Sequence, residues 1–152
     1  MPKLLKNPEK DKILDYLKDR FGLARDIFND YWIVASSRQA FLFRKQNEDF
    51  KWPKDNFIRA GLPFIKIVAG YFKPTTVFIQ RFGNLANRNT LTLNTQTIKT
   101  LCNQGEIAIE LNTSPGYIII KTGEHPIGVA LFLEDKRLIC KFPKVLRRVF
   151  LE

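Results

Sequence analysis

The sequence predicts an α+β protein, in which a small N-terminal α/β unit over residues 1–55 is followed by a small β-barrel over residues 56–152. Two observations favour this class. The first part combines helical apolar spacing with two β-type runs, and the second holds six or seven short β-type runs separated by turn residues. So many short strands favour a closed sheet, because closure removes exposed edges. The polar stretch 46–56, which contains Pro53, is the expected linker.

The N-terminal unit is expected to begin with a helix. Asn7 can cap this helix, Pro8 suits its first position, and Gly22 suits its end. Its apolar residues recur at helical spacing and are Ile13, Leu14, Leu17 and Phe21. A shorter helical stretch and two paired strands are expected to follow, over 24–29, 31–35 and 40–44.

The second part is expected to be mostly strands. They are predicted over 64–69, 75–81, 91–93, 105–110, 116–121, 125–132 and 137–142. Residues 95–102 are typical of a helix, because Ile98 and Leu101 fall on one face. Gly128 interrupts an apolar run, which indicates a bulge, a sharp bend or a close backbone approach.

The charge balance favours a polyanionic partner. The net charge is +10, with 12 Lys and Arg against 9 Asp and Glu in residues 1–55 and 13 against 6 in residues 56–152. Neutralising phosphates releases condensed counterions, so a basic chain is suited to nucleic acid. An excess of cations that serves solubility alone is the alternative. A membrane surface is disfavoured, because the sequence has no long apolar segment and no strongly amphipathic basic helix.

A pattern of glycine, aromatic and basic residues runs through the last third of the chain. Its members are Gly116, Tyr117, Pro126, Ile127, Gly128, Leu138, Phe142, Pro143, Lys144, Leu146 and Arg147. This pattern resembles the PUA-like RNA-binding domain at the C-terminus of Sun/Fmu-type rRNA cytosine-C5 methyltransferases. Residues 59–64 and 71–74 look like the start of the same domain. Val129-Ala130 and Val145 depart from the family pattern, which often has Trp-Gly and Gly there.

The resemblance implies the RNA-binding module without the enzyme. A chain of 152 residues is too short to hold a methyltransferase domain as well. The sequence also has no Gly-rich strand-to-helix loop and no Pro-Cys catalytic pair. We therefore expect a PUA-like barrel preceded by a small α/β unit, a layout similar to that of two-domain ribosome-biogenesis factors. The expected partners are rRNA or tRNA and an RNA-modification enzyme or ribosome-assembly factor.

The densest group of cations lies at the C-terminus. Lys144, Arg147 and Arg148 share one face if Pro143 starts a helix, whereas in a strand Arg147 points away from the other two. Either arrangement suits phosphate contacts. A solvated terminal charge run is the alternative.

Five further residues are candidates for the RNA site. Phe72 can stack an unpaired base beside Lys73, although a phenylalanine is more often part of a core. Arg81 and Arg88 flank an Asn-rich loop, and Lys141 is placed to extend the basic patch.

Catalytic residues, metal ligands and cofactors are not expected. His125 is the only histidine and precedes a proline in a turn, and Glu106 and Glu110 are expected to be solvated. Cys102 and Cys140 are expected to be reduced and buried. The start of the chain lacks the apolar core of a signal peptide, so we expect a cytoplasmic location.

One enzymatic alternative stays open. Related ASCH-type domains include hydrolases of modified nucleosides, so the resemblance also admits a small hydrolase. Such an activity would require a lysine, a threonine and a glutamate in the mouth of a barrel. Lys66, Thr76 and Glu110 are the available residues, although nothing in their spacing demands that role.

Overall fold

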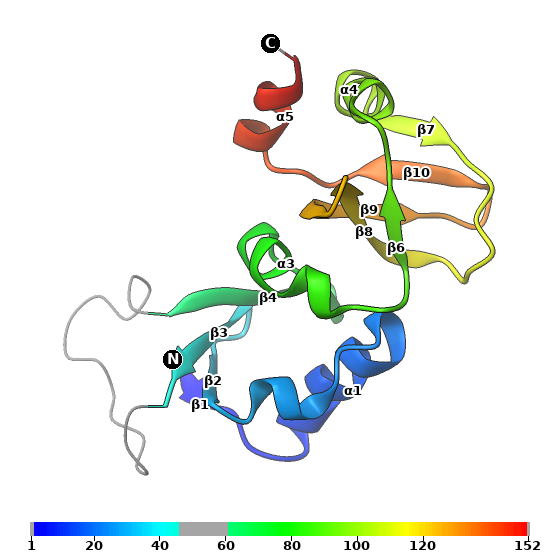
Figure 1. The fold of residues 1–152 in the computed structure, drawn as a ribbon. Coiled ribbons are helices and arrows are strands. Elements are labelled where there is room, and N and C mark those ends of the chain that lie inside the picture. The colour runs from blue at the N-terminus through cyan, green and yellow to red at the C-terminus, as the bar shows by residue number, and fades with distance from the viewer. Residues whose placement is uncertain (1, 46–60, 152) are drawn as a thin grey trace. The chain divides into compact units, whose positions relative to one another are not determined.

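The chain forms a mixed α/β structure with two compact units. A computed structural model describes residues 2–45 and 61–151, and the units are Met1–Phe78 (unit 1) and Ile79–Glu152 (unit 2). The described residues form two five-stranded sheets (Figure 1). They also form four α-helices, which are α1 (Glu9–Phe21), α3 (Thr76–Phe82), α4 (Thr95–Gln104) and α5 (Lys144–Leu151). None of the helices in this part of the chain is long and apolar enough to cross a membrane.

The sheet of unit 1 is an antiparallel meander. Its strands follow chain order and are β1 (Lys3–Leu4), β2 (Tyr31–Ala35), β3 (Gln39–Arg44), β4 (Leu62–Val68) and β5 (Tyr71–Pro74). β4 pairs with β3, with Ala40 opposite Ile65. The segment from residue 61 to residue 78 therefore completes unit 1.

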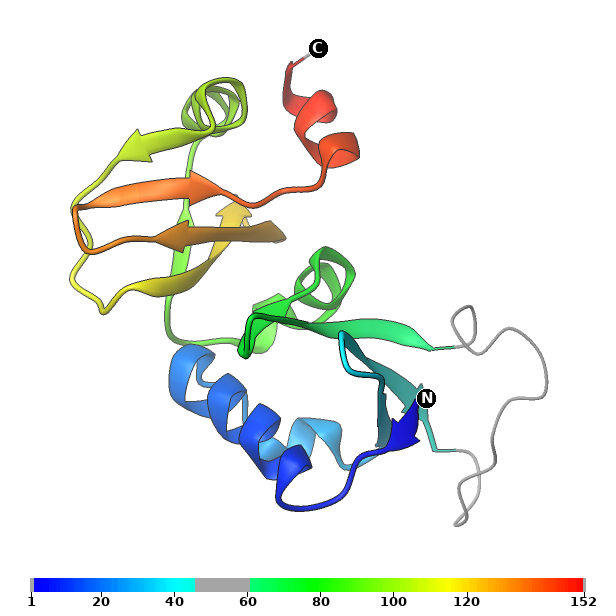
Figure 2. The same cartoon turned by 180° about the vertical axis from the view of Figure 1, so that it is seen from behind.

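One helix and one 3₁₀ turn lie along the same side of this sheet (Figures 1 and 2). They are α1 and η1 (Arg25–Phe28). The residues that α1 buries are the predicted Ile13, Leu14, Leu17 and Phe21. The helix ends at Gly22, whose φ of 69° is easily adopted by a residue without a Cβ. At its start Pro8, and not the predicted Asn7, is the capping residue, and no side chain caps it.

Three phenylalanine rings form the centre of the unit 1 core. Phe64 of β4 lies 4.8 Å from Phe78 of α3 and 5.4 Å from Phe28 of η1, measured between ring centroids. Each of the three side chains is at most 2% exposed. Because aromatic side chains bury large areas, this trio joins η1, β4 and the start of α3 into one core.

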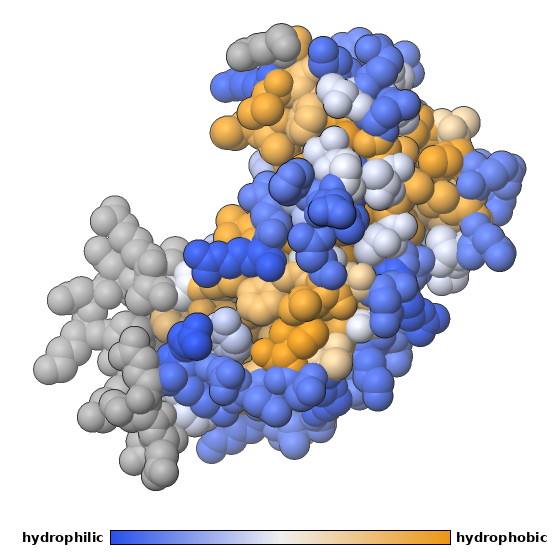
Figure 3. All heavy atoms as spheres, viewed as in Figure 1, coloured by the Kyte–Doolittle hydropathy of each residue, from blue (hydrophilic) through white to orange (hydrophobic). Residues whose placement is uncertain are grey.

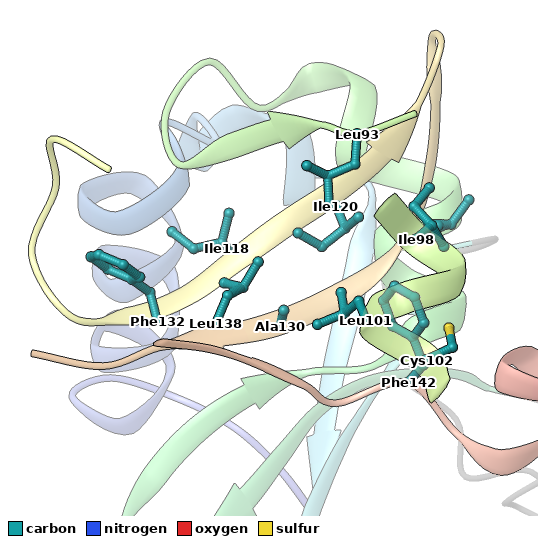
Figure 4. Packing of buried hydrophobic residues seen from close by; sticks show 11 residues of the cluster. Leu93, Ile98, Leu101, Cys102, Ile118, Ile120, Ala130, Phe132, Leu138 and Phe142 are labelled. Carbon is teal, nitrogen blue, oxygen red and sulfur yellow. The ribbon is translucent and has the colours of Figure 1, made fainter. Parts of the chain in front are cut away.

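The sheet of unit 2 is mixed, with the order β6-β8-β9-β10-β7. Its strands are β6 (Thr90–Thr92), β7 (Glu106–Ala108), β8 (Gly116–Thr122), β9 (His125–Phe132) and β10 (Arg137–Cys140). β6 runs parallel to β8, and the other pairs are antiparallel. Figure 4 shows Ile98, Leu101 and Cys102 of α4 facing the apolar side chains of the sheet.

The structure does not show the predicted closed barrel. The described strands of residues 56–152 divide between two open sheets, because β4 and β5 pair with β3 and not with the later strands. The boundary between the compact units accordingly falls after residue 78, whereas we expected it after residue 55. The predicted linker over 46–56, and residues 59–60 of the family pattern, lie outside the described residues.

The predicted strand over 75–81 is also wrong, because this segment is α3. Thr75 starts the helix: its hydroxyl accepts a hydrogen bond from the Phe78 N–H at 3.2 Å and donates one to the Pro63 carbonyl at 2.7 Å. The β-branched residues Thr75, Thr76 and Val77 favoured a strand. The capping hydroxyl of Thr75 and the burial of Phe78 stabilise the helix over the strand.

The remaining elements of unit 2 agree with the sequence. The helix expected over 95–102 is α4, and the last three predicted strands are β8, β9 and β10. A glycine is required at position 128 because the Phe142 ring packs closely against its backbone. A Cβ added there would lie 2.9 Å from Cδ1 of Phe142. The glycine therefore makes room for the aromatic ring that leads into α5.

Candidate nucleic-acid interface

The C-terminal cation cluster lies on a helix. α5 begins at Lys144, directly after Pro143, and the Arg147 N–H donates to the Pro143 carbonyl at 3.0 Å. The helix packs through Leu146 and Phe150 against the buried cluster of unit 2. Of the two arrangements that the sequence left open, the structure therefore shows the helical one.

The three cations of α5 do not share one role. Arg147 is half-buried, and its guanidinium donates to the carbonyl of Cys102 from Nε at 3.2 Å and from Nη2 at 2.5 Å. That carbonyl is in the last turn of α4, where carbonyl groups have no partner within the helix and where a cation is favoured by the helix dipole. Arg147 thus holds α5 against the end of α4, and this position was not predicted from the sequence.

Lys144 and Arg148 are the cations of α5 that face solvent. Both are exposed, lie one helical turn apart, and take part in no ion pair among the described residues. Lys141 precedes the helix and is half-buried. The structure therefore keeps two of the three predicted cluster residues available for a ligand.

An apolar stripe lies beside these cations. Val145 and Val149 are 74% and 64% exposed, and Leu151 is 49% exposed. Figure 3 shows hydrophobic surface on α5. The exposed side of the helix is thus both basic and apolar.

The other predicted cations of unit 2 lie away from α5 in the chain. Arg81 is exposed in the last turn of α3, and Arg88 is exposed in the loop before β6. The Asn-rich loop between them is fixed to β8 by its last residue. Asn89 has a φ of 54°, and its backbone carbonyl accepts a hydrogen bond from the Ile119 N–H at 2.9 Å. Lys99, which the sequence analysis did not consider, is an exposed residue of α4, the helix against which α5 packs.

Phe72 and Lys73 belong to unit 1, whereas α5 belongs to unit 2. Both lie in β5, where Lys73 stands opposite Lys66 of β4. The half-buried ring of Phe72 meets Tyr16 of α1 edge-on, with the ring centroids 5.7 Å apart. The alternative in which Phe72 packs within the protein therefore describes it better than an open stacking platform.

The observed division changes where the positive charge lies. Residues 1–78 hold 15 Lys and Arg against 9 Asp and Glu, and residues 79–152 hold 10 against 6. Several cations are neutralised by ion pairs, among them Arg25 with Asp11 and Asp15, and Arg137 with Glu106 and Asp135. The excess is therefore shared between the two units, and it does not by itself select unit 2.

The residues of the hydrolase alternative divide between the units. Lys66 and Thr76 belong to unit 1, where Lys66 is exposed, and Glu110 is exposed in unit 2. The described residues contain no group of three or more His, Cys, Asp or Glu side chains that could hold a metal. His125 is exposed at the start of β9.

The two cysteines meet beneath α5. Cys102 is fully buried in α4, and its thiol hydrogen-bonds with that of Cys140, a half-buried residue of β10. Burial raises the pKa of the Cys102 thiol to about 11, and the contact with Cys140 adds to this rise. Cys102 therefore stays protonated well above neutral pH.

Alkylation with iodoacetamide at pH 8 is expected to modify Cys140 before Cys102. The reactive species is the thiolate, and at this pH a thiol with a pKa near 11 is about 0.1% ionised. Peptide mapping by mass spectrometry after brief labelling measures the order. In the control variant Cys140→Ser, labelling should become slow in the native protein and rapid in urea. Equal labelling of both thiols in the native protein would contradict this expectation.

A scan against protein-family models and a search of curated proteins both find no match for this chain. The resemblance of the last third to a PUA-like domain therefore rests on the residues quoted above.

Proposed function

We propose that this chain is a non-catalytic RNA-binding protein that uses the exposed side of α5. Lys144 and Arg148 contact phosphates there, and Arg147 positions the helix. In the cell the protein acts in the cytoplasm on rRNA or tRNA, in RNA modification or ribosome biogenesis. No cofactor is required for this role.

The observation that supports the proposal best is the pairing of exposure with missing counterions. Lys144 and Arg148 are exposed one turn apart and have no ion pair among the described residues, on a chain of net charge +10. Some other surface cations are already neutralised, as Arg137 is by Glu106 and Asp135. A lysine and an arginine without an ion-pair partner in the protein can neutralise phosphates of a nucleic acid. The release of the counterions condensed on that nucleic acid then favours binding.

The resemblance to a PUA-like domain supports the same surface. Its Pro-Lys-x-Leu-Arg segment coincides with Pro143, Lys144, Leu146 and Arg147. Because the described sheets are open and β4 and β5 belong to unit 1, a complete PUA-like barrel is no part of the proposal.

The test is RNA binding by the double variant Lys144→Gln/Arg148→Gln. Affinity for a structured RNA is expected to fall about tenfold, which corresponds to about 1.4 kcal/mol, with little change in sequence preference. The slope of log K against log salt should decrease by about one for each lost contact. Fluorescence anisotropy at several salt concentrations measures both quantities.

The matched control is Lys6→Gln/Lys18→Gln, which removes the same net charge from exposed positions of unit 1. It should bind RNA almost as well as the wild type. If the two double variants lose affinity equally, the attraction comes from net charge alone and the assignment to α5 fails. Salt-independent binding, or none at low salt, would reject the RNA-binding function itself.

The apolar stripe favours one second candidate, a protein-docking helix. Val145 and Val149 are exposed beside the cations, and such a combination suits a partner with an acidic and apolar groove. The variant Val145→Ser/Val149→Ser separates the two functions. It should leave the salt slope of RNA binding unchanged, whereas docking of an apolar groove would be lost.

A further inference from the structure

A pocket of about 500 Å³ is lined by residues of unit 1 alone, and none of them belongs to the candidate interface. It is lined by β1 and the residue after it, the first half of α1, the turn between β2 and β3, and the hairpin of β4 and β5. Its volume is within the range of small-molecule sites, roughly 300–1,000 Å³. The two edge strands of the described sheet, β1 and β5, both contribute to it.

The floor of the pocket is apolar. Leu5, Ile13 and Ala35 line it and are each at most 7% exposed. Phe72 and Ile67 add half-buried apolar wall. The ring of Phe72 is held by its edge contact with Tyr16, so this wall is in place before any ligand arrives.

The rim is polar and carries one uncompensated positive charge. Lys3 Nζ lies 3.2 Å from a carboxylate oxygen of Glu9, so these two charges neutralise one another. Lys12 also lines the pocket, is exposed, and has no ion pair among the described residues. Ser37 adds an exposed hydroxyl in the turn after β2.

We propose that this pocket binds a small amphipathic anion, with its apolar body against Leu5, Ile13 and Phe72 and its carboxylate or phosphate on Lys12 and the Ser37 hydroxyl. The apolar floor stabilises the body of such a ligand by removing its surface from water. The charge at the rim selects an anion, because a cation would meet Lys12 without a free carboxylate to offset it. The proposal is independent of RNA binding by α5.

The test uses the full ¹⁵N-labelled chain and three probes: sodium octanoate, AMP and inorganic phosphate. Octanoate or AMP is expected to shift the amide resonances of Leu5, Ile13 and Ala35 in a saturable manner. The first represents a carboxylate on an aliphatic chain, and the second a phosphate on a ring system, so the two arms distinguish the sources of the anion. Inorganic phosphate alone should leave these amides unchanged, because it has no apolar body.

Two variants and one control complete the experiment. Lys12→Gln should weaken binding of the active probe about tenfold, as expected for loss of a charged hydrogen bond. Ser37→Trp should block the mouth and abolish binding, while the dispersion of the spectrum checks that the fold persists. Lys18→Gln, an exposed α1 residue that does not line the pocket, should bind like the wild type.

Three results would overturn the proposal. The first is that neither octanoate nor AMP shifts the lining amides at millimolar concentration. The second is that inorganic phosphate alone produces the same shifts, which would mean binding by charge only. The third is that Lys12→Gln and Ser37→Trp both bind like the wild type. Lys144→Gln/Arg148→Gln should retain the pocket's affinity, so failure of the RNA proposal and failure of this one are distinguishable.

Discussion

Replacing Phe64 with alanine is expected to lower the free energy of unfolding of unit 1 by about 3–5 kcal/mol. The side chain is fully buried, with its ring centroid 4.8 Å from that of Phe78 and 5.4 Å from that of Phe28. Truncation leaves a cavity between η1, β4 and α3, and aromatic contacts are lost in addition to the buried area.

Tryptophan fluorescence reports on this variant selectively. Both tryptophans of the sequence, Trp32 and Trp52, precede residue 79, and Trp32 lies in β2. Urea unfolding followed by this signal should shift to lower denaturant in Phe64→Ala. Hydrogen exchange in residues 116–140 of unit 2 should stay as in the wild type.

The matched control is Phe132→Ala, which truncates the same residue type in the core of unit 2. Phe132 is 1% exposed in β9. Its loss should speed exchange in residues 116–140 and leave the tryptophan transition in place. If both variants shift both signals equally, the two compact units unfold as one, and the division at residue 78 has no thermodynamic counterpart.

Replacing Arg147 with alanine is expected to release α5 at a cost of about 1.5–3 kcal/mol, the range for hydrogen bonds from charged groups. The guanidinium is the donor of two hydrogen bonds to the Cys102 carbonyl, and this acceptor would lose both. Hydrogen exchange in residues 144–151 should become faster. RNA affinity should fall as well, because Lys144 and Arg148 would no longer be held in place.

Two comparisons separate the positioning of α5 by Arg147 from the direct contact of Lys144 and Arg148 with RNA. Arg147→Lys keeps the charge but has no planar fork, so it should restore only part of the protection of α5. Lys144→Gln/Arg148→Gln should lose RNA affinity with normal exchange in α5, since exposed charges contribute little to stability. Wild-type protection of α5 in Arg147→Ala would show that Leu146 and Phe150 suffice to dock the helix.

Local patterns predicted the elements whose periodicity and end signals agree. The helical spacing of Ile13, Leu14 and Leu17, followed by Gly22, predicted α1 correctly. The β-branched run at Ile118, Ile119 and Ile120 predicted β8, because such side chains suit a buried pleated surface. At Gly128 the sequence predicted a bulge, a sharp bend or a close backbone approach, and the structure shows a close approach to Phe142.

The same rules failed where two local preferences compete. Thr75, Thr76 and Val77 favour a strand, yet the helix of this segment places Phe78 against Phe28 and Phe64. The capping hydroxyl of Thr75 was the available signal, and it was outweighed by the β-branched run.

The sequence by itself determined the basic character of the chain, the helix and hairpin at its start, the long C-terminal strands and the concentration of cations after Pro143. Only the tertiary structure decided which strands pair, because a β-type run in the sequence does not indicate which distant strand is its partner. In the structure β4 pairs with β3, and two open sheets are present in place of the predicted barrel. It likewise divided the roles of three adjacent cations. Arg147 reaches the carbonyl of Cys102, 45 residues away in the chain, because α5 packs against α4, whereas Lys144 and Arg148 are exposed to solvent.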